Sequence, residues 1–168
     1  FYYAEDIPQM VVGDALRFKQ ILTNLISNAI KFTPDGEIIV RVRMEDDEIG
    51  QCLLHFSVQD SGIRLSGTDR KKLFESFSQG DASVTRQFGG TGLGLAISKQ
   101  LVHLMRGQIG FEDNQERAPT EKGSTFWFTA SFKVDEQHEL VEHPRFEQLR
   151  VVSYLAHPAT ASVLRSYL

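Results

Sequence analysis

Residues 17–33 constrain the fold of this chain more than any other stretch, and they read RFKQILTNLISNAIKFT. When the stretch is wound as an α-helix, its apolar side chains share one broad face: Phe18, Leu22, Leu25, Ile26 and Ala29. The opposite face is polar and consists of Arg17, Gln20, Asn24, Ser27, Asn28 and Lys31. An amphipathic helix of this kind buries its apolar stripe, so we expect it to organise the core.

The polar face is unusual because it carries two carboxamides one turn apart and then a lysine. Asparagine is an indifferent helix former, so Asn24 and Asn28 in register suggest a chemical task. An amide oxygen is a hard, neutral ligand that suits Mg²⁺, and Lys31, one turn further, suits a phosphate. A solvated face with incidental asparagines explains the same residues, so the helix alone leaves both interpretations open.

Composition places the chain among soluble globular proteins of one ordinary domain. Its 168 residues are 41% hydrophobic, which is enough for a core, and its net charge of −4 gives no basic footprint for nucleic acid. No apolar run approaches the ~20 residues of a membrane span. The single cysteine, Cys52, excludes an internal disulfide. Without an initiator methionine or a visible signal peptide, we expect an excised piece of a longer protein.

Periodicity along the rest of the chain predicts an α+β fold. Alternating residues predict strands at 37–44, 51–59, 108–112 and 125–134. The first two strands would form an antiparallel hairpin across an acidic turn at 45–50. Further helices are predicted at 66–77 and 91–105, and the polar residues 78–90 between them predict a mobile loop. We expect the last helix to end at Gly107 and to pack through Leu93, Ile97, Leu101 and Leu104.

A glycine-rich run, GGTGLGL at residues 89–95, opens that last helix. Closely spaced glycines let backbone N–H groups converge on an anion, and a helix N-terminus adds a partial positive charge. The run is not a Walker A loop, because no Lys-Ser or Lys-Thr follows it, and no parallel βαβ unit surrounds it as in a dinucleotide site. A glycine-rich hinge without a ligand stays open as the alternative.

Two shorter motifs lie at strand ends. Asp60 ends an apolar strand, where its carboxylate can accept a hydrogen bond from an exocyclic amine such as that of adenine. Gly62 lets the backbone approach a flat ring, although an ordinary Asp-Ser-Gly turn explains the same residues. The run GST at 123–125 either lines the same pocket or only starts the last strand.

The order and spacing of these motifs resemble the N, G1, F, G2 and G3 boxes of the bacterial sensor histidine kinases. The matching segments are Asn24 with NAIKFT at 28–33, DSG at 60–62, LFESF at 73–77, GTGLG at 90–94 and GST at 123–125. The resemblance covers residues 1–134 and is greatest to hybrid kinases of the BarA/GacS type. It implies a Bergerat (GHKL) fold, which is an α+β two-layer sandwich with a mixed, mostly antiparallel sheet, helices on one face and a flexible ATP lid.

This resemblance implies ATP and Mg²⁺ as ligands and assigns the phosphate-binding residues by motif position. Asn28 would coordinate the Mg²⁺ that bridges the phosphates, and Asn24 would support it. Lys31 would contact phosphate, and Arg86 is a lid cation that would reach the γ-phosphate. Residues at the start of the last helix would complete the phosphate site, largely through backbone donors: Gly90, Thr91, Gly92, Leu93 and Gly94.

The resemblance also assigns the base pocket and the lid. Asp60 would hold the adenine amine, and Phe32 would pack beside the base. Gly62 and Thr125 would line the same pocket. The lid would be anchored by two aromatic residues, Phe74 and Phe77.

The implied activity is transfer of the γ-phosphoryl group of Mg·ATP to a histidine on a separate dimerisation and phosphotransfer domain. Phosphoryl transfer needs mainly positioning and charge neutralisation, so no nucleophile is required here. None of the 5 histidines lies in an H-E-x-x-T-P-like motif, and we do not expect the chain alone to autophosphorylate. A receiver domain or response regulator, or another sensor kinase, is a further implied partner, and nucleic acid is not. The parent resembles inner-membrane receptors, which makes this a cytoplasmic domain.

Two other functions compete with this interpretation. In GHKL ATPases such as gyrase, MutL and Hsp90, a Glu one turn before the metal-binding Asn is the general base for water. Here that position is Asn24, which favours kinase chemistry. A regulatory pseudokinase that acts through protein contacts stays open, because the G1 pattern Asp-x-Gly-x-Gly has Arg64 in place of its second glycine. Arg64 either obstructs the nucleotide, swings outward without harm, or adds a phosphate contact.

The character of the chain changes after residue 134. Residues 135–147 are acidic and are expected to form a linker. Residues 148–168 are similar to the start of a receiver domain, although SYLA at 153–156 stands where an acidic pair would follow the first strand. The expected division is therefore 1–134 for the catalytic and ATP-binding domain, 135–147 for the linker and 148–168 for a truncated, receiver-like unit.

Overall fold

The computed structural model describes residues 7–8, 10–48, 50–63, 73–75, 93–114 and 123–135. Its elements are, in chain order, β1 (Val11–Val12), α1 (Ala15–Phe32), β2 (Ile38–Glu48), β3 (Gln51–Asp60), α4 (Gly94–Leu104), β4 (Ile109–Asp113) and β5 (Ser124–Val134). The strands form one sheet in the order β1-β5-β3-β2, and β4 also pairs with β5. All of these described pairings are antiparallel.

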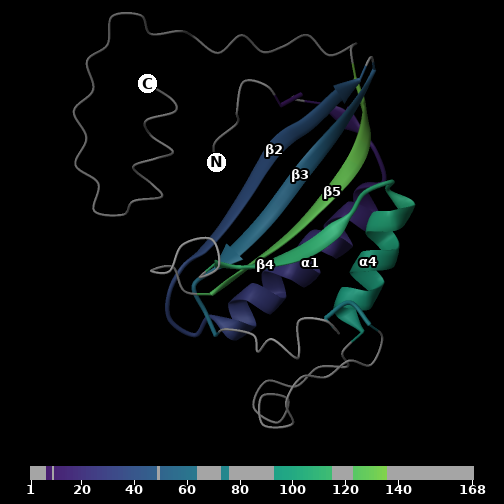
Figure 1. Cartoon of the computed structure of the whole chain (residues 1–168). Helices are drawn as coiled ribbons and strands as arrows, with labels where there is room; N and C mark the ends of the chain where they lie inside the picture. Colours follow the sequence, from purple (N-terminus) through teal and green to yellow (C-terminus); the bar gives the residue numbers. More distant parts are fainter. Residues whose placement is uncertain are drawn as a thin grey trace, which may run out of the picture.

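The sheet is twisted, and α1 and α4 both lie on one of its faces (Figure 1). The hydrophobic core fills the space between these helices and the sheet, with buried residues from α1, α4, β3 and β5. This is the two-layer α+β arrangement predicted from the sequence. The segment expected to form the ATP lid, 78–90, lies outside the described residues.

The first helix follows its predicted pattern closely. Asp14 is its N-cap, and the Asp14 carboxylate accepts a hydrogen bond from the backbone N–H of Arg17 at 3.0 Å. The fully buried stripe of α1 consists of Ile21, Leu25 and Ala29. Ile21, which is 0% exposed, was not on the predicted apolar face, so the stripe is wider than the sequence pattern indicated.

β3 and β5 lie side by side and supply most of the sheet's core. Their helix-facing side chains are buried: Cys52, Leu54, Phe56, Val58, Phe128, Ala130 and Phe132. The rings of Phe56 and Phe128 stack with 4.9 Å between centroids, and Phe18 of α1 meets Phe56 edge-on at 4.9 Å. The predicted inward faces of both strands are confirmed. The same alternation brings Asp60 and Ser124, which pair across the two strands, to the helix-facing side at one end of the sheet.

The sheet departs from the prediction in two places. β2 runs on through Glu48, because the acidic residues expected to form a turn pair with β3 after a bulge between Met44 and Asp46. The turn between β2 and β3 is therefore shorter than predicted and contains Gly50, whose φ of +76° favours glycine. β1 was not predicted, because two residues are too few to show alternation.

The predicted packing face of the last helix is right at Leu101, which packs against the core, and wrong at Ile97 and Leu104. α4 buries Ala96, Ser98 and Val102, whereas Ile97 and Leu104 are 40% and 61% exposed. Apolar residues occur on more than one side of this helix, so the periodicity of the sequence does not identify the buried face. The buried face is the one that α1 approaches, because its small side chains let the two helices come close.

Gly107 has a different role from the predicted helix cap. The left-handed residue after α4 is Arg106, with φ +57°. A Cβ on Gly107 would lie 1.7 Å from the carbonyl oxygen of Thr129, so glycine is required where the turn crosses β5. The turn is held there by the backbone N–H of Gln108, which donates to the Thr129 hydroxyl at 2.8 Å.

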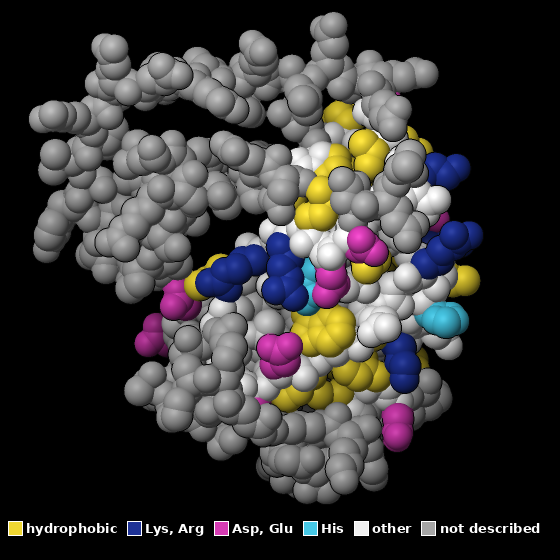
Figure 2. Space-filling model, turned by 45° about the horizontal axis from the view of Figure 1, so that its top comes forward, with side chains coloured by type: hydrophobic (Ala, Val, Ile, Leu, Met, Phe, Trp, Pro, Cys, Tyr) yellow, Lys and Arg dark blue, Asp and Glu magenta, His cyan; other side chains and the backbone are white. Residues whose placement is uncertain are grey.

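The face of the sheet opposite the helices carries a ring stack. His55 of β3 and Trp127 of β5 are diagonal neighbours across the two strands, with 5.4 Å between ring centroids and 19° between planes. On the same face Arg41 donates to the side-chain oxygen of Gln59 at 2.6 Å. In the view of Figure 2, acidic and basic side chains are interspersed with hydrophobic ones rather than gathered into a single-sign patch.

The His55 imidazole makes the stability of the fold depend on pH. Partial burial and, secondarily, the nearby Arg43 guanidinium lower the pKa of His55 below the usual imidazole value. The unfolded chain therefore binds a proton more readily than the folded chain, so stability falls as pH decreases from about 7.5 through the unfolded value of about 6.5 towards the lowered folded value. The variant His55→Phe keeps a ring against Trp127 but cannot titrate. In urea unfolding between these pH values, we expect its free energy of unfolding to fall less with decreasing pH than that of the wild type. Equal slopes in the two proteins would contradict this.

Candidate functional site

A buried carboxylate stands at the end of β3. Asp60 is 4% exposed, and each of its two oxygens accepts one hydrogen bond: Oδ1 from the backbone N–H of Gly62 at 2.9 Å, and Oδ2 from the Ser124 hydroxyl at 2.7 Å. Neither donor carries a charge, and no described cation forms a salt bridge with Asp60. A carboxylate oxygen can accept more than one hydrogen bond, so the fixed Asp60 side chain keeps capacity for an N–H donor of a ligand.

Gly62 brings the end of β3 against the end of α1. A Cβ on Gly62 would lie 2.2 Å from the carbonyl oxygen of Phe32 and 2.6 Å from the Thr33 hydroxyl. The backbone N–H of Ile63 donates to the same Phe32 carbonyl at 3.0 Å. The sequence predicted that Gly62 permits a close approach, and in the described structure the group that approaches is the C-terminus of α1. This contact sets Phe32 beside the Asp60 end of the sheet.

Asn24 joins α1 to α4. Its amide nitrogen donates to the hydroxyl of Ser98, which is 2% exposed, at 2.9 Å. A Cβ on Gly94 would lie 2.4 Å from the Asn24 amide oxygen, so a larger first residue of α4 would displace the Asn24 side chain. Asn24 therefore positions the start of α4 against α1.

Asn28 differs from Asn24 in its contacts. It lies one turn further along the same face of α1 and is partly exposed, and its side chain makes no hydrogen bond to any described residue. Lys31, in the last turn, lies with its ammonium 5.2 Å from the centre of the Phe32 ring. The Asn28 amide oxygen, which has no described hydrogen-bond partner, is a ligand that suits Mg²⁺. Phosphate oxygens would have to supply further ligands. Among the described residues there is no cluster of His, Cys, Asp or Glu that could hold a metal.

The N-terminus of α4 is a candidate site for an anion. Its N-cap residue, Leu93, offers no side-chain hydrogen bond to the first turn. Uncapped backbone N–H groups at a helix start, together with the helix dipole, favour a phosphate. The other predicted contributors to the phosphate site and lid lie outside the described residues: Arg64, Phe77, Arg86, Gly90, Thr91 and Gly92.

The GST motif contributes differently from the prediction. Thr125 was expected to line the nucleotide pocket, but alternation along β5 turns its side chain to the face opposite Asp60. Its hydroxyl donates to the amide oxygen of Asn114 at 2.7 Å. Ser124, which the sequence did not single out, is the residue that contacts the Asp60 carboxylate. The antiparallel register between 51–60 and 124–133 was the signal that would have found Ser124.

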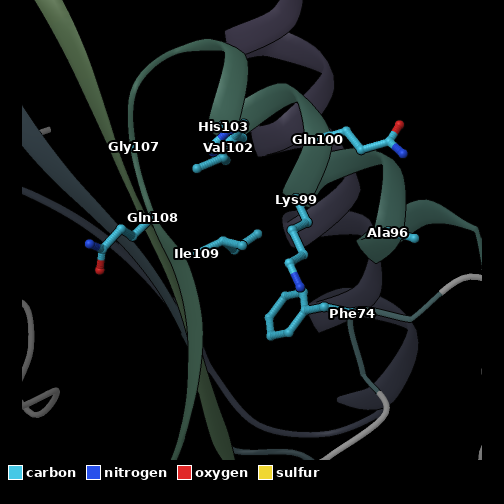
Figure 3. A pocket seen from close by; sticks show the side chains of 9 residues that line it. All are labelled: Phe74, Ala96, Lys99, Gln100, Val102, His103, Gly107, Gln108 and Ile109. Carbon is cyan, nitrogen blue, oxygen red and sulfur yellow. The ribbon is translucent and has the colours of Figure 1, made fainter.

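Phe74, the predicted lid anchor, lies at a cavity on another side of α4. The cavity has a volume of 610 Å³ and is lined by Phe74, Ala96, Lys99, Gln100, Val102, His103, Gly107, Gln108 and Ile109. In Figure 3 the Lys99 side chain extends in the direction of Phe74, while Gln100 points away from the cavity. Apart from Phe74, no predicted nucleotide-binding residue lines it, so its size does not make it the candidate site.

The candidate site residues lie on α1 or on the elements that contact it. Near its middle it meets the start of α4 through Asn24, and at its end it meets the close of β3 through Phe32. A sheet with both described helices on one face, a fixed carboxylate at a strand end and an asparagine-bearing helix between them define the Bergerat class of nucleotide-binding domains. The chain belongs to the histidine kinase-, DNA gyrase B- and HSP90-like ATPase family, which matches residues 13–134.

Within that family the chain resembles sensor histidine kinases. It is 52% identical over 124 residues to the sensor histidine kinase GacS of Pseudomonas protegens, and 44% identical over 123 residues to the signal transduction histidine-protein kinase BarA of Escherichia coli. These alignments cover 74% and 73% of this chain but only 13% of each relative. The chain therefore spans a small part of the length of the curated relatives it matches.

Solved structures agree with this placement. Full-length ShkA in complex with AMPPNP matches with a TM-score of 0.58 and 32% identity, covering 77% of this chain and 24% of ShkA. The mycobacterial sensor histidine kinase MprB matches with a TM-score of 0.56 and 26% identity, covering 74% of this chain and 76% of that structure. The predicted family and fold class are thereby confirmed.

Proposed function

We propose that this chain is the catalytic and ATP-binding domain of a hybrid sensor histidine kinase. It binds Mg·ATP and transfers the γ-phosphoryl group to a histidine on a separate dimerisation domain. The observation that carries the proposal is the Asp60 carboxylate, buried at a strand end and oriented by two uncharged donors as an acceptor for an exocyclic amine. Asn28, Lys31 and the α4 N-terminus supply the phosphate and metal side of the same site. The bound AMPPNP of the ShkA structure supports ATP as the ligand class.

Catalysis is favoured over a purely regulatory role. Relatives with up to 52% identity are named as histidine kinases, and Asn24 at the position of an ATPase general base leaves no group there to activate water. When bound, Mg²⁺ would neutralise phosphate charge. Asn28 would hold it, Asn24 would fix the helix spacing, and Lys31 would contact a phosphate oxygen.

The proposal extends to the neighbouring parts of the protein. Residues 1–134 form the catalytic domain, 135–147 a linker and 148–168 the start of a receiver-like unit. The phosphoacceptor histidine and a receiver or response regulator are the partners, and the domain works on the cytoplasmic side of an inner-membrane parent. None of the helices in the described part of the chain is long and apolar enough to cross a bilayer.

Calorimetric titration of the chain with ATP, with and without Mg²⁺, tests the proposal. Metal-dependent binding, followed by transfer of labelled phosphate to the parent protein's dimerisation domain supplied separately, is the expected result. A folded chain that binds no ATP, but regains binding in Arg64→Gly, would overturn the catalytic role and leave a regulatory domain. Binding without phosphotransfer to the supplied domain would also count against the kinase activity.

A further inference from the structure

One buried side chain joins the ends of three strands directly behind Asp60. Asn114 follows β4 and is 1% exposed. Its amide nitrogen donates to the backbone carbonyl of Asp60 at 3.0 Å, and its amide oxygen accepts from the Thr125 hydroxyl at 2.7 Å. Its backbone N–H donates to the carbonyl of Gly123 at 3.3 Å. The close of β3, the close of β4 and the start of β5 thus meet at this residue.

We propose that Asn114 is a positioning residue for the Asp60 carboxylate, and that it thereby sets how strongly the site prefers a purine with a 6-amino group. The inference rests on the proposed ATP-binding function. Asn114 holds the Asp60 backbone, whereas Ser124 and Gly62 hold the carboxylate. Asn114 itself makes its contact on the carbonyl side and need not touch the nucleotide.

The fit around the Asp60 carbonyl is tight. A Cβ on Gly123, which has φ +85°, would lie 2.0 Å from the Asp60 carbonyl oxygen. That oxygen is therefore enclosed between the Gly123 backbone and the Asn114 amide. A shift of Asp60 away from Asn114 breaks a hydrogen bond in a buried site, where an unsatisfied polar group is costly. The position of the carboxylate consequently follows the position of the amide.

The chemistry of this contact requires a carboxamide. One partner is a carbonyl, which only accepts, and the other is a hydroxyl that donates to Asn114, so the residue between them must donate at one atom and accept at another. Aspartate has no donor for the carbonyl when ionised, and alanine has neither group. Thr125, on the face opposite Asp60, fixes which way the amide points.

The test compares two Mg²⁺-bound nucleotides that differ only at the 6-amino group: ATP and purine riboside triphosphate. The dissociation constant of purine riboside triphosphate divided by that of ATP, measured for the wild type, gives what Asp60 contributes to recognising the amine. In Asn114→Ala we expect this ratio to fall about 3- to 10-fold through weaker ATP binding, as for loss of one well-placed hydrogen bond, with purine riboside triphosphate bound as before. Thr125→Val, which frees the Asn114 amide to rotate, should shift the ratio in the same direction by a smaller factor.

Thr129→Val is the matched control, because it removes a buried hydroxyl contact on the same face of β5, to Gln108, away from Asp60. It should lower stability but leave the ratio unchanged. Equal weakening of both nucleotides in Asn114→Ala, or an unchanged ratio, would overturn the positioning role while the wild type still binds ATP. If Asn114→Ala does not fold, the ratio in Thr125→Val decides: a fall supports the positioning role, and an unchanged ratio overturns it. A wild type that binds ATP without distinguishing the two nucleotides would refute the role of Asp60 and with it this inference, whereas no ATP binding at all would be the failure of the proposed function.

Discussion

Asp60→Asn is expected to weaken ATP binding about 10- to 100-fold, as for loss of a hydrogen bond to a charged acceptor. The amide has the size of the carboxylate, so the space around β3 does not change. However, it replaces one of the two accepting oxygens with a donor, which must face either the Gly62 N–H or the Ser124 hydroxyl. Ser124 can reverse its hydroxyl and accept, so the variant should fold. Its carboxamide then offers a weaker, uncharged acceptor to the adenine amine.

Calorimetric titration with Mg·ATP measures this effect, and thermal unfolding confirms that the variant is folded. Asp14→Asn is the matched control, because Asp14 is an exposed N-cap and asparagine caps a helix equally well. We expect Asp14→Asn to bind ATP like the wild type. A folded Asp60→Asn protein with unaltered ATP affinity would exclude Asp60 as the base-recognition residue.

Gly62→Ala is expected to destabilise the fold by about 1–3 kcal/mol, which is the usual range for overpacking. The added methyl group would lie 2.2 Å from the Phe32 carbonyl oxygen and beside the Thr33 hydroxyl, which is already buried without a described hydrogen-bond partner. The nearest atoms, the carbonyl oxygen and carbon of Phe32, belong to the backbone and cannot rotate away as a side chain could. The end of α1 must then move away from β3, which displaces Phe32 and Lys31, so ATP binding should weaken as well.

Urea unfolding and ATP titration of the same samples test this prediction. Gly50→Ala is the control for the change in unfolded-state entropy, because both substitutions restrict the unfolded chain equally. At Gly50 nothing lies within 4 Å of the added Cβ, and only its φ of +76° costs stability, by about 1 kcal/mol. ATP affinity should be retained in Gly50→Ala. If Gly62→Ala is as stable as the wild type, the close contact between α1 and β3 is not required.

The sequence predicted the parts of the fold that depend on local periodicity. The helix at 15–32, its Asp14 cap and the inward faces of β3 and β5 follow from alternation and helical spacing, and each was confirmed. The buried face of α4 was not predictable in this way, because it depends on where α1 approaches. Asn24 was assigned a supporting role, and its contact with Ser98 is in keeping with that role.

The candidate site likewise contains residues that local sequence identifies and residues that only the strand register brings together. Asp60 could be chosen from the sequence, because its strand end and its motif are both local features. Its partners Ser124 and Asn114 are 64 and 54 residues away along the chain, and only strand register brings them together. The side chain of Thr125, the residue chosen from the GST motif, therefore lies on the face opposite Asp60, since a one-residue step along a strand reverses the face of the side chain.

The position of β5 within the sheet also affects how the chain folds during its synthesis. This strand, 124–134, pairs with β1, β3 and β4, yet it is the last of the described strands to leave the ribosome. Until it emerges, the β2–β3 hairpin presents an unpaired edge, and the aromatic side chains of β3 lack Phe128. Such long-range pairing slows folding and leaves strand edges open to other chains. A nascent chain that stops before residue 124 therefore exposes the edge of β3 to pairing with other chains.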